Sequence, residues 1–297
     1  MKNKRKLVLG TSILVFMISM TTFSCVYGTN NFFYKANQVK NRVDYIHELD
    51  DFETDIKSES INEKKYKILV LTDVHLGNRV KKVEMERFFS WLDTCKTNND
   101  LPEFCLILGD NVDHGYKKEY DTYCDFTKHI KDKGIPVITM FGNHDLYNSG
   151  WDNFKKMCYP HCSLFHYDTP GFSWYGIDTG TGNIGKKQFD LLKNAFAKDK
   201  KPKIVISHYP LTNSRTVGAI SFHDSTERNL LIDLYAKNNV KAVLCGHLHK
   251  TKYKDLGAFK EYGFPSFCYA KYPAWTLLEI NETNPNVPEL KLLPRKF

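Results

Sequence analysis

The stretch Lys67-Ile-Leu-Val-Leu-Thr-Asp73-Val-His75 is a largely apolar run that ends in two polar residues. Apolar runs of this length are typical of strands that are buried on both faces of a sheet. Asp73 and His75 are two positions apart, so both side chains can point the same way at the end of such a strand. A carboxylate and an imidazole placed together in this way can bind a divalent cation.

Four more short polar motifs follow, and most of them also end an apolar, β-prone run. They are Gly109-Asp-Asn-Val-Asp113, Gly142-Asn-His-Asp145, Ser207-His208 and Gly246-His-Leu-His249. The five motifs contribute oxygen and imidazole ligands that suffice for two divalent metals. These candidate ligands are Asp73, His75, Asp110, Asn143, His208, His247 and His249. Mixed oxygen and nitrogen ligands favour Mn, Fe, Zn or Co over Ca or Mg.

Strands and helices are expected to alternate beyond residue 66. The apolar runs predict strands at 67–72, 104–108, 136–141, 163–167, 172–177, 203–207 and 241–245. Helical spacing is found at 80–94, 119–131, 186–197 and 226–238, and a possible short helix at 39–49. This order predicts parallel strands joined by crossover helices, with ligands bound at the carboxyl ends of the strands. We expect a β-meander over Tyr253–Ile280 and a Pro-rich tail beyond it.

The first 28 residues differ from the rest of the chain. A basic start, Lys2 to Lys6, precedes an apolar run from Leu7 to Met20, which is the pattern of a secretory signal. A lipid-attachment site at Cys25 and a retained membrane anchor are the alternatives. We therefore expect export or membrane attachment by residues 1–28, a polar linker at 29–65 and a globular domain at 66–297.

Bulk composition limits the possible partners. The net charge is +8, of which residues 1–28 carry four, leaving a mild +4 that suits anionic substrates without indicating a nucleic-acid partner. No pair of cysteines has zinc-finger spacing among the eight in the chain. An exported location would permit Cys158 and Cys162 to form a disulfide, and without Cys25 the odd count leaves at least one free thiol.

The ligand types indicate a reaction. Asp110 can bridge two cations, which can share a water and lower its pKa to give a hydroxide near neutral pH. Such a pair supports hydrolysis of a phosphate ester without a covalent enzyme intermediate. His144 lies beside Asn143 and is the best-placed proton donor, with Asp113 as the carboxylate that orients its imidazole. For Asp145, a supporting contact within the site and a helix N-cap remain open.

The set DxH…GDxxD…GNHD…H…GHxH resembles the calcineurin-like metallophosphoesterase superfamily, over roughly residues 66–280. The resemblance implies an α/β fold in which a β-sandwich of mixed sheets is flanked by helices in α/β/β/α layers, with a dimetal site at the strand ends. It also implies how the ligands divide. One metal takes Asp73, His75, Asp110 and His249, and the other takes Asp110, Asn143, His208 and His247.

Departures from the family pattern concern specificity. Purple acid phosphatases carry Tyr where this chain has Asp113, and protein Ser/Thr phosphatases carry Arg where it has His114. We expect a phosphatase or phosphodiesterase with a small phosphate-ester substrate. The alternatives are a cyclic-nucleotide phosphodiesterase, a nuclease of the DNA-break-repair type, and an inactive binding protein of the same fold. The candidate substrate contacts are His114, Arg79, Arg215 and His223.

Overall fold

The computed structural model describes residues 38–49, 64–77, 82–212, 222, 224–267, 274–284 and 289–296. The predicted signal or anchor at 1–28 lies outside these residues, as do Arg79, Arg215 and His223, so those expectations stay predictions. Within the described part of the chain, no helix has both the length and the hydropathy needed to cross a membrane.

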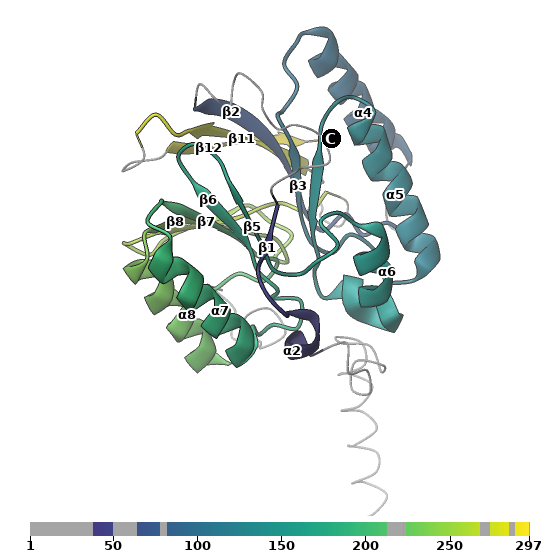
Figure 1. Ribbon diagram of the computed structural model, residues 1–297. Coiled ribbons are helices and arrows are strands. Elements are labelled where there is room, and N and C mark those ends of the chain that lie inside the picture. The colour runs from purple at the N-terminus through teal and green to yellow at the C-terminus, as the bar shows by residue number, and fades with distance from the viewer. Residues whose placement is uncertain are drawn as a thin grey trace, which may run out of the picture.

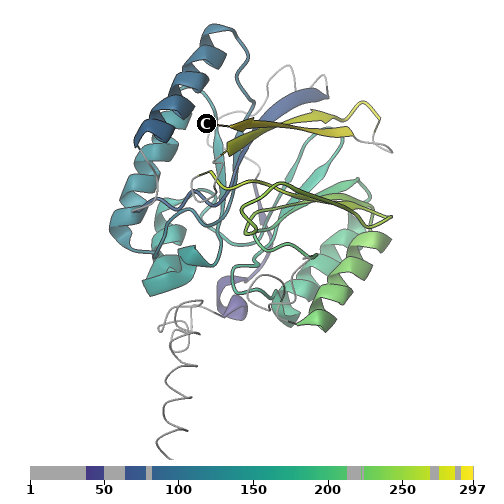
Figure 2. The ribbon, with the colours of Figure 1, turned by 180° about the vertical axis from the view of Figure 1, so that it is seen from behind.

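Two mixed sheets form the centre of the molecule (Figures 1 and 2). One sheet has the order β12-β11-β2-β3-β4, and its strands are β2 (Lys65–Leu71), β3 (Cys105–Leu108), β4 (Val137–Met140), β11 (Ala274–Asn281) and β12 (Glu289–Lys296). The other has the order β1-β5-β6-β7-β8-β10-β9. Its strands are β1 (His47–Glu48), β5 (Phe165–Asp168), β6 (Ser173–Gly176), β7 (Lys203–Ile206), β8 (Val240–Cys245), β9 (Lys252–Asp255) and β10 (Lys260–Gly263).

Helices cover the outer face of each sheet. The five-stranded sheet is covered by α4 (Lys82–Thr97), α5 (Lys117–Lys131) and α6 (Gly150–Met157), the last preceded by the 3-10 helix η3 (His144–Ser149). The seven-stranded sheet is covered by α2 (Val39–Arg42), α7 (Gly185–Lys198) and α8 (Ser225–Lys237). The predicted α/β/β/α fold is therefore confirmed.

Strand β2 shows why its sequence is apolar at nearly every position. Leu69 and Leu71 pack in the core under α4 and α5, whereas Ile68 and Val70 pack in the core between the sheets. Successive strand residues point to opposite faces of the sheet. A strand covered on both sides therefore needs apolar residues at its odd and its even positions. The uninterrupted run that begins the ligand motif thus follows from the four-layer arrangement.

Two parts of the chain differ from the predicted elements. The Tyr253–Ile280 segment is not one meander: β9 and β10 form a hairpin in the seven-stranded sheet, whereas β11 belongs to the other sheet. The β11 side chains alternate between two cores, with Trp275 under the helices and Leu278 between the sheets, and a local pattern does not distinguish the two sheets. The Pro-rich tail contains β12, where Pro294 is tolerated because the strand lies at the sheet edge.

The N-terminal part of the described chain contributes to the fold. The helix expected over 39–49 is only the four-residue α2, followed by β1, which pairs with β5. Val39 and Val43 are buried in the core under α7. This segment falls in the range that the sequence assigns to a polar linker, yet in the structure it packs on the domain.

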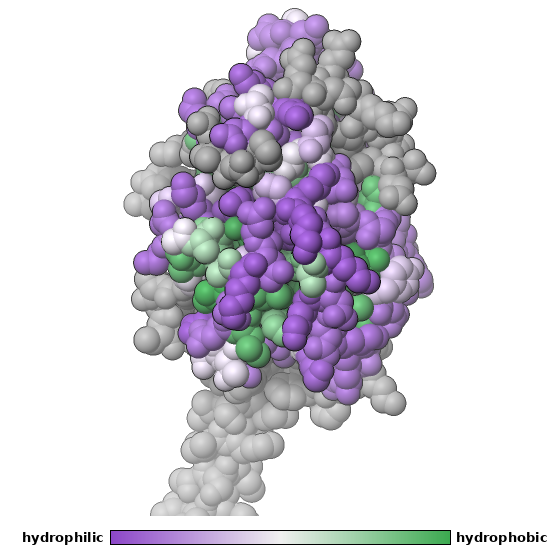
Figure 3. All heavy atoms as spheres, turned by 60° about the vertical axis from the view of Figure 1, so that its left-hand side comes forward, coloured by the Kyte–Doolittle hydropathy of each residue, from purple (hydrophilic) through white to green (hydrophobic). Residues whose placement is uncertain are grey.

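Figure 3 shows a face on which hydrophilic residues cover most of the area and apolar residues form a smaller group between them.

Cys158 and Cys162, which the sequence allowed to pair, are free thiols buried in separate cores. Their burial in different layers explains why proximity in sequence does not bring the sulfurs together.

A buried carboxylate joins the two sheets at the end away from the ligand motifs. Glu282, directly after β11, accepts hydrogen bonds from the Tyr66 hydroxyl at 2.5 Å, the Thr169 hydroxyl at 2.5 Å and the Gly171 backbone N–H at 2.6 Å. Its side chain is almost inaccessible to solvent. Removing it would leave three buried donors without this acceptor.

We predict that Glu282→Ala lowers the free energy of unfolding by on the order of 3 kcal/mol, because buried donors that lose a charged acceptor are costly. Urea unfolding followed by tryptophan fluorescence measures the change. The control is Glu279→Ala on the same strand, whose half-exposed carboxylate lies 3.4 Å from Lys291 Nζ and should contribute less than about 1 kcal/mol. Equal effects of the two variants would contradict the role of Glu282.

Candidate metal centre

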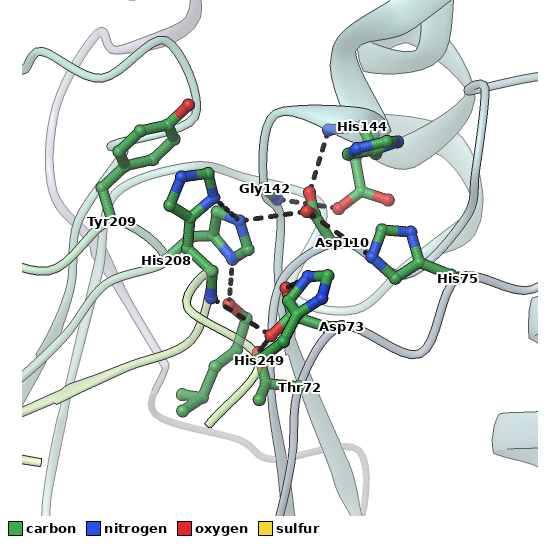
Figure 4. A network of polar contacts seen from close by, with 12 residues as sticks. Thr72, Asp73, His75, Asp110, Gly142, His144, His208, Tyr209 and His249 are labelled. Carbon is green, nitrogen blue, oxygen red and sulfur yellow. Dashed lines mark hydrogen bonds and ion pairs between the residues drawn. The ribbon is translucent and has the colours of Figure 1, made fainter. Parts of the chain in front are cut away.

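The ligand motifs of both sheets meet at one edge of the molecule (Figure 4). Asp73, Asp110 and Asn143 follow β2, β3 and β4 of the five-stranded sheet. His208 follows β7, and His247 and His249 follow β8, both of the seven-stranded sheet. Parallel strands that end together place these side chains side by side although they are far apart in sequence.

Six of the seven predicted ligands fall in two close groups of side chains. One atom from each of Asp73, His75, Asp110 and His249 lies within 4.8 Å of the others, and the same holds for Asp110, His208 and His247. Asp110 belongs to both groups, as a bridging ligand must. Asn143 lies between Gly142 and His144, whose backbone N–H donates to Asp110 Oδ1 at 2.9 Å.

The backbone at the ligand positions is strained. Asp73, His75, Asp110, His247 and His249 all have φ between 49° and 66°. This left-handed region is uncommon for residues with a side chain and is found mostly where surrounding structure imposes it. The strain re-aims each side chain just after its strand, which turns consecutive strand ends into one convergent cluster.

Two glycines permit the close approach of the loops. A Cβ at Gly142 would lie 2.2 Å from Asp110 Oδ1, and one at Gly246 would lie 2.0 Å from Thr72 Oγ1. Neither position has room for a side chain. The glycines of these two motifs therefore serve the packing of loop against loop rather than the chemistry.

The two carboxylates are buried and charged. Burial raises the pKa of Asp73, but the His249 imidazole, whose Nε2 lies 3.0 Å from Asp73 Oδ1, lowers it to about 2. Burial also raises the pKa of Asp110, and His208 lowers it well below the usual range. His208 Nε2 lies 3.2 Å from Asp110 Oδ2. Burial lowers the pKa of His208 and Asp110 raises it to about 9. These carboxylates thus attract positive charge that protons or a metal cation can supply.

Hydrogen bonds to carbonyl groups fix which imidazole nitrogen faces the cluster. His208 Nδ1 lies 2.8 Å from the Leu108 carbonyl oxygen, which can only accept, so Nδ1 carries the proton and Nε2 faces Asp110. His247 Nδ1 lies 3.3 Å from His208 Nε2, and the Tyr209 ring stacks on the His247 ring with centroids 3.9 Å apart. Two nitrogens directed at the same point are suited to one cation.

Asn143 offers a further observation that favours metal binding. Its side chain is buried, and among the described residues its Oδ1 has no hydrogen-bond partner. A buried carbonyl oxygen is normally hydrogen-bonded, so one left without a partner, in a loop whose next residue donates to Asp110, requires an explanation. A cation at the Asp110–His208–His247 group would provide the missing partner, and the residues present therefore fit a dimetal centre.

Asp113 lies in one group with the imidazoles of His75 and His144. The sequence predicted that its carboxylate orients His144, and His144 Nδ1 lies 2.8 Å from the Asp113 backbone carbonyl oxygen. The Asp113 carboxylate oxygen Oδ1 lies 3.2 Å from His75 Nδ1. His75 has a φ of 49°, in the left-handed region, which sequence spacing does not reveal. Asp113 therefore contacts the predicted ligand His75 through its carboxylate and the predicted proton donor His144 through its carbonyl oxygen.

Asp145, for which two roles were open, joins two ligand loops. Its carboxylate is fully buried and accepts from the backbone N–H groups of Gly142 at 2.7 Å, Asn111 at 3.0 Å and Val112 at 3.2 Å. Burial and the nearby Asp110 raise the pKa of Asp145 to about 7. Asp145 thus holds the Asp110 and Asn143 loops together, and it does not cap a helix, since Asn143 is the residue that precedes η3.

His114 is the described member of the candidate substrate contacts. It is half-exposed at the rim, with its Nδ1 2.9 Å from Glu119 Oε1 and its backbone N–H 2.8 Å from Glu119 Oε2. Its ring stacks against the exposed Tyr116. A substrate role for His114 remains a prediction.

Several supporting residues were not predicted. The Thr179 hydroxyl accepts from the backbone N–H groups of His208 at 3.1 Å and Tyr209 at 3.0 Å. The Ser266 hydroxyl donates to the Asp73 carbonyl oxygen at 2.9 Å. Asp178-Thr179 follows the 172–177 strand in the same way that the ligand motifs follow theirs, and this pattern was available in the sequence. Ser266 has no such signal.

Comparisons with known proteins agree with this geometry. The family model for calcineurin-like phosphoesterases matches residues 66–251. A protein of Fibrobacter succinogenes named "Probable cyclic nucleotide phosphodiesterase" is 24% identical over 241 residues, which is 75% of this chain and 92% of the relative. A 3',5'-cyclic adenosine monophosphate phosphodiesterase of Haemophilus influenzae is 24% identical over 244 residues, 76% of this chain and 85% of the relative.

Solved structures share the fold. A dimetal phosphatase of Danio rerio superposes with a TM-score of 0.59 at 10% identity, covering 78% of this chain and 99% of that chain. GAP50 of Plasmodium, described as the anchor in the inner membrane complex, has a TM-score of 0.55 at 14% identity, covering 78% and 88%. At such low identities these likenesses establish the fold alone.

We predict that Asp113→Asn weakens binding of Mn²⁺ by about 10- to 100-fold, because a ligating imidazole loses the carboxylate that orients it. Titration of metal-depleted protein with Mn²⁺ measures the dissociation constant. Asp121→Asn, an exposed carboxylate on α5 paired with Lys117, is the control and should bind as the parent does. A lower kcat with an unchanged dissociation constant would show that Asp113 acts on His144 alone.

Proposed function

The chain belongs to the calcineurin-like phosphoesterase family, and on this basis we propose that it is a metal-dependent phosphodiesterase acting on a small cyclic-nucleotide-type diester. The observation that carries the proposal is the placement of Asp110 in both ligand groups, with the His144 backbone N–H bonded to its carboxylate. The names of the similar proteins support the diester preference.

The chain can hold two cations with the ligands already described. Asp73, His75, Asp110 and His249 would hold one, and Asp110, Asn143, His208 and His247 would hold the other. Two bound divalent ions would supply a water of lowered pKa and positive charge beside the phosphoryl oxygens. Asp110 and Asp73 would keep this charge in place, because burial excludes competing water from their carboxylates.

In this proposal His144 protonates the leaving group. Hydrolysis of a cyclic diester releases a ribose oxygen as an alkoxide, which needs a proton to leave. The His144 Nδ1–H donates to the Asp113 carbonyl oxygen, so Nε2 is the atom that can carry and transfer a proton. The His144 backbone N–H is bonded to Asp110, and this contact holds the donor beside the metal ligands.

Turnover of defined esters by metal-depleted and Mn²⁺-reloaded protein tests the proposal. We expect hydrolysis of 3',5'-cyclic AMP and bis(p-nitrophenyl) phosphate after reloading, and loss of both activities in Asp110→Asn, which removes the shared ligand. Asp100→Asn, an exposed partner of Lys67, should retain both. Cleavage of linear DNA without turnover of small esters would favour the nuclease alternative. No turnover of any ester or DNA would favour the inactive binding protein.

Replacement of His144 by Asn should lower kcat for cyclic AMP by about 10²- to 10⁴-fold, because the alkoxide then leaves without a general acid. The loss should be much smaller with bis(p-nitrophenyl) phosphate, since p-nitrophenolate is a stable anion. Metal content should match the parent, and His129→Asn on the exposed face of α5 should change neither rate. Equal losses on both substrates, or loss of metal, would contradict the assignment.

A further inference from the structure

A buried ion pair connects the N-terminal segment to the loop after β6. Arg42, the last residue of α2, lies outside the range 66–251 that the family model matches. Its Nε lies 2.7 Å from Asp178 Oδ2 and its second guanidinium nitrogen 2.9 Å from Asp178 Oδ1. Both side chains are completely buried. The planar fork of arginine therefore makes a two-bond contact that fixes the orientation of the Asp178 carboxylate.

The Asp178 loop supports the backbone of a metal ligand. Asp178 is held by Gln188, which accepts from the Asp178 N–H and donates to the Asp178 carbonyl oxygen, each at 2.8 Å. The next residue, Thr179, accepts the backbone N–H groups of His208 and Tyr209. Tyr209 in turn stacks on His247. A displacement of the Asp178 loop would therefore be passed to two of the predicted ligands.

Arg42 also contacts the segment that carries Asn143. Its guanidinium carbon lies 5.5 Å from the centre of the Phe141 ring, within the range of a cation–π interaction. The Asp178 loop packs on the same ring, since a Cβ on Gly180 would lie 2.6 Å from it. Phe141 directly precedes Gly142-Asn143. The guanidinium is thus placed between the supports of two ligand segments, His208 on one side and Asn143 on the other.

The ion pair is not needed merely to attach the segment. Val39 and Val43 already bury apolar side chains in the core under α7, and β1 pairs with β5. A buried ion pair contributes little net stability, because desolvation of the two charges offsets their attraction. What it provides is a fixed geometry at the contact between the loop and α2, the helix that lies between α6 and α7 in the view of Figure 1.

We propose that Arg42 is a positioning residue of the metal centre, acting through Asp178-Thr179 on His208 and through Phe141 on Asn143. This inference rests on the proposed metal-dependent function. It assigns the segment Val39–Glu48 to the support of the site, although it lies far from the ligand motifs in sequence.

The test compares the parental full chain with the single variants Arg42→Lys, Arg42→Met and Asp178→Asn. It also includes the double variant that combines Arg42→Met with Asp178→Asn. Lys187→Ala is the matched control, because Lys187 Nζ lies 3.1 Å from Asp44 Oδ1 and makes an exposed ion pair between α7 and the same segment. The Mn²⁺ dissociation constant, kcat and KM for bis(p-nitrophenyl) phosphate, and thermal unfolding of the metal-free protein are measured for each variant.

We expect Arg42→Met and Asp178→Asn each to weaken Mn²⁺ binding by about 10- to 100-fold, the range found when supports of metal ligands are removed. The double variant should lose little more than either single one, because both act through one contact. KM should change less than kcat at saturating metal. Arg42→Lys keeps the charge but lacks the planar guanidinium group. It should fold more readily than Arg42→Met and should weaken Mn²⁺ binding to a smaller extent.

Variants that melt at lower temperature yet keep the parental Mn²⁺ dissociation constant and kcat would overturn the proposal, as would an equal change in Lys187→Ala. If Arg42→Met does not fold, the Mn²⁺ dissociation constant and kcat of Arg42→Lys decide in its place: parental values for both would overturn the proposal. A parent that binds Mn²⁺ but hydrolyses no ester contradicts the proposed function alone, since the dissociation constants still test Arg42. A parent that does not bind Mn²⁺ overturns both.

Discussion

The burial of two carboxylates in one small volume is the constraint on which the site depends. Asp73 and Asp110 are inaccessible to solvent, and uncompensated charges in the interior are unfavourable. The surrounding imidazoles, the left-handed backbone at the ligand positions and the close glycine contacts together create a place for positive charge. The raised pKa of His208 follows from the negative charge of Asp110, and the Asn143 oxygen without a partner offers a further ligand. A pair of divalent cations would match both the charge and the oxygen.

The cluster also requires both sheets to be in place. Asp73, Asp110 and Asn143 come from the five-stranded sheet, whereas His208 and His247 come from the seven-stranded one. The sandwich core between the sheets therefore fixes the distance between the two halves of the site. Glu282 ties the sheets at the opposite end, and Arg42 ties the N-terminal segment to the ligand edge. The chemistry thus depends on contacts well outside the motifs.

Sequence patterns predicted most of the elements because the strands are covered on both faces and the helices on one. Strands such as 104–108 and helices such as 186–197 lie within a few residues of β3 and α7. The failures have a common origin. The 253–280 segment crosses from one sheet to the other, and residues 39–48 pack with only two buried valines, so neither carries a local pattern that identifies its partner.

The sequence by itself determined which side chains come together in the cluster, since the five motifs contain the predicted ligands, the proposed proton donor and the glycines that let their loops approach. Only the tertiary structure decided which contacts the other residues make. It directed the Asp113 carboxylate toward His75, used Asp145 to join two ligand loops, and brought Arg42 to Asp178 across more than a hundred residues. Ligand identity follows from residue type and position after a strand, which are local properties. The contacts that support the ligands depend on packing between distant segments, and spacing in the sequence gives no information about that packing.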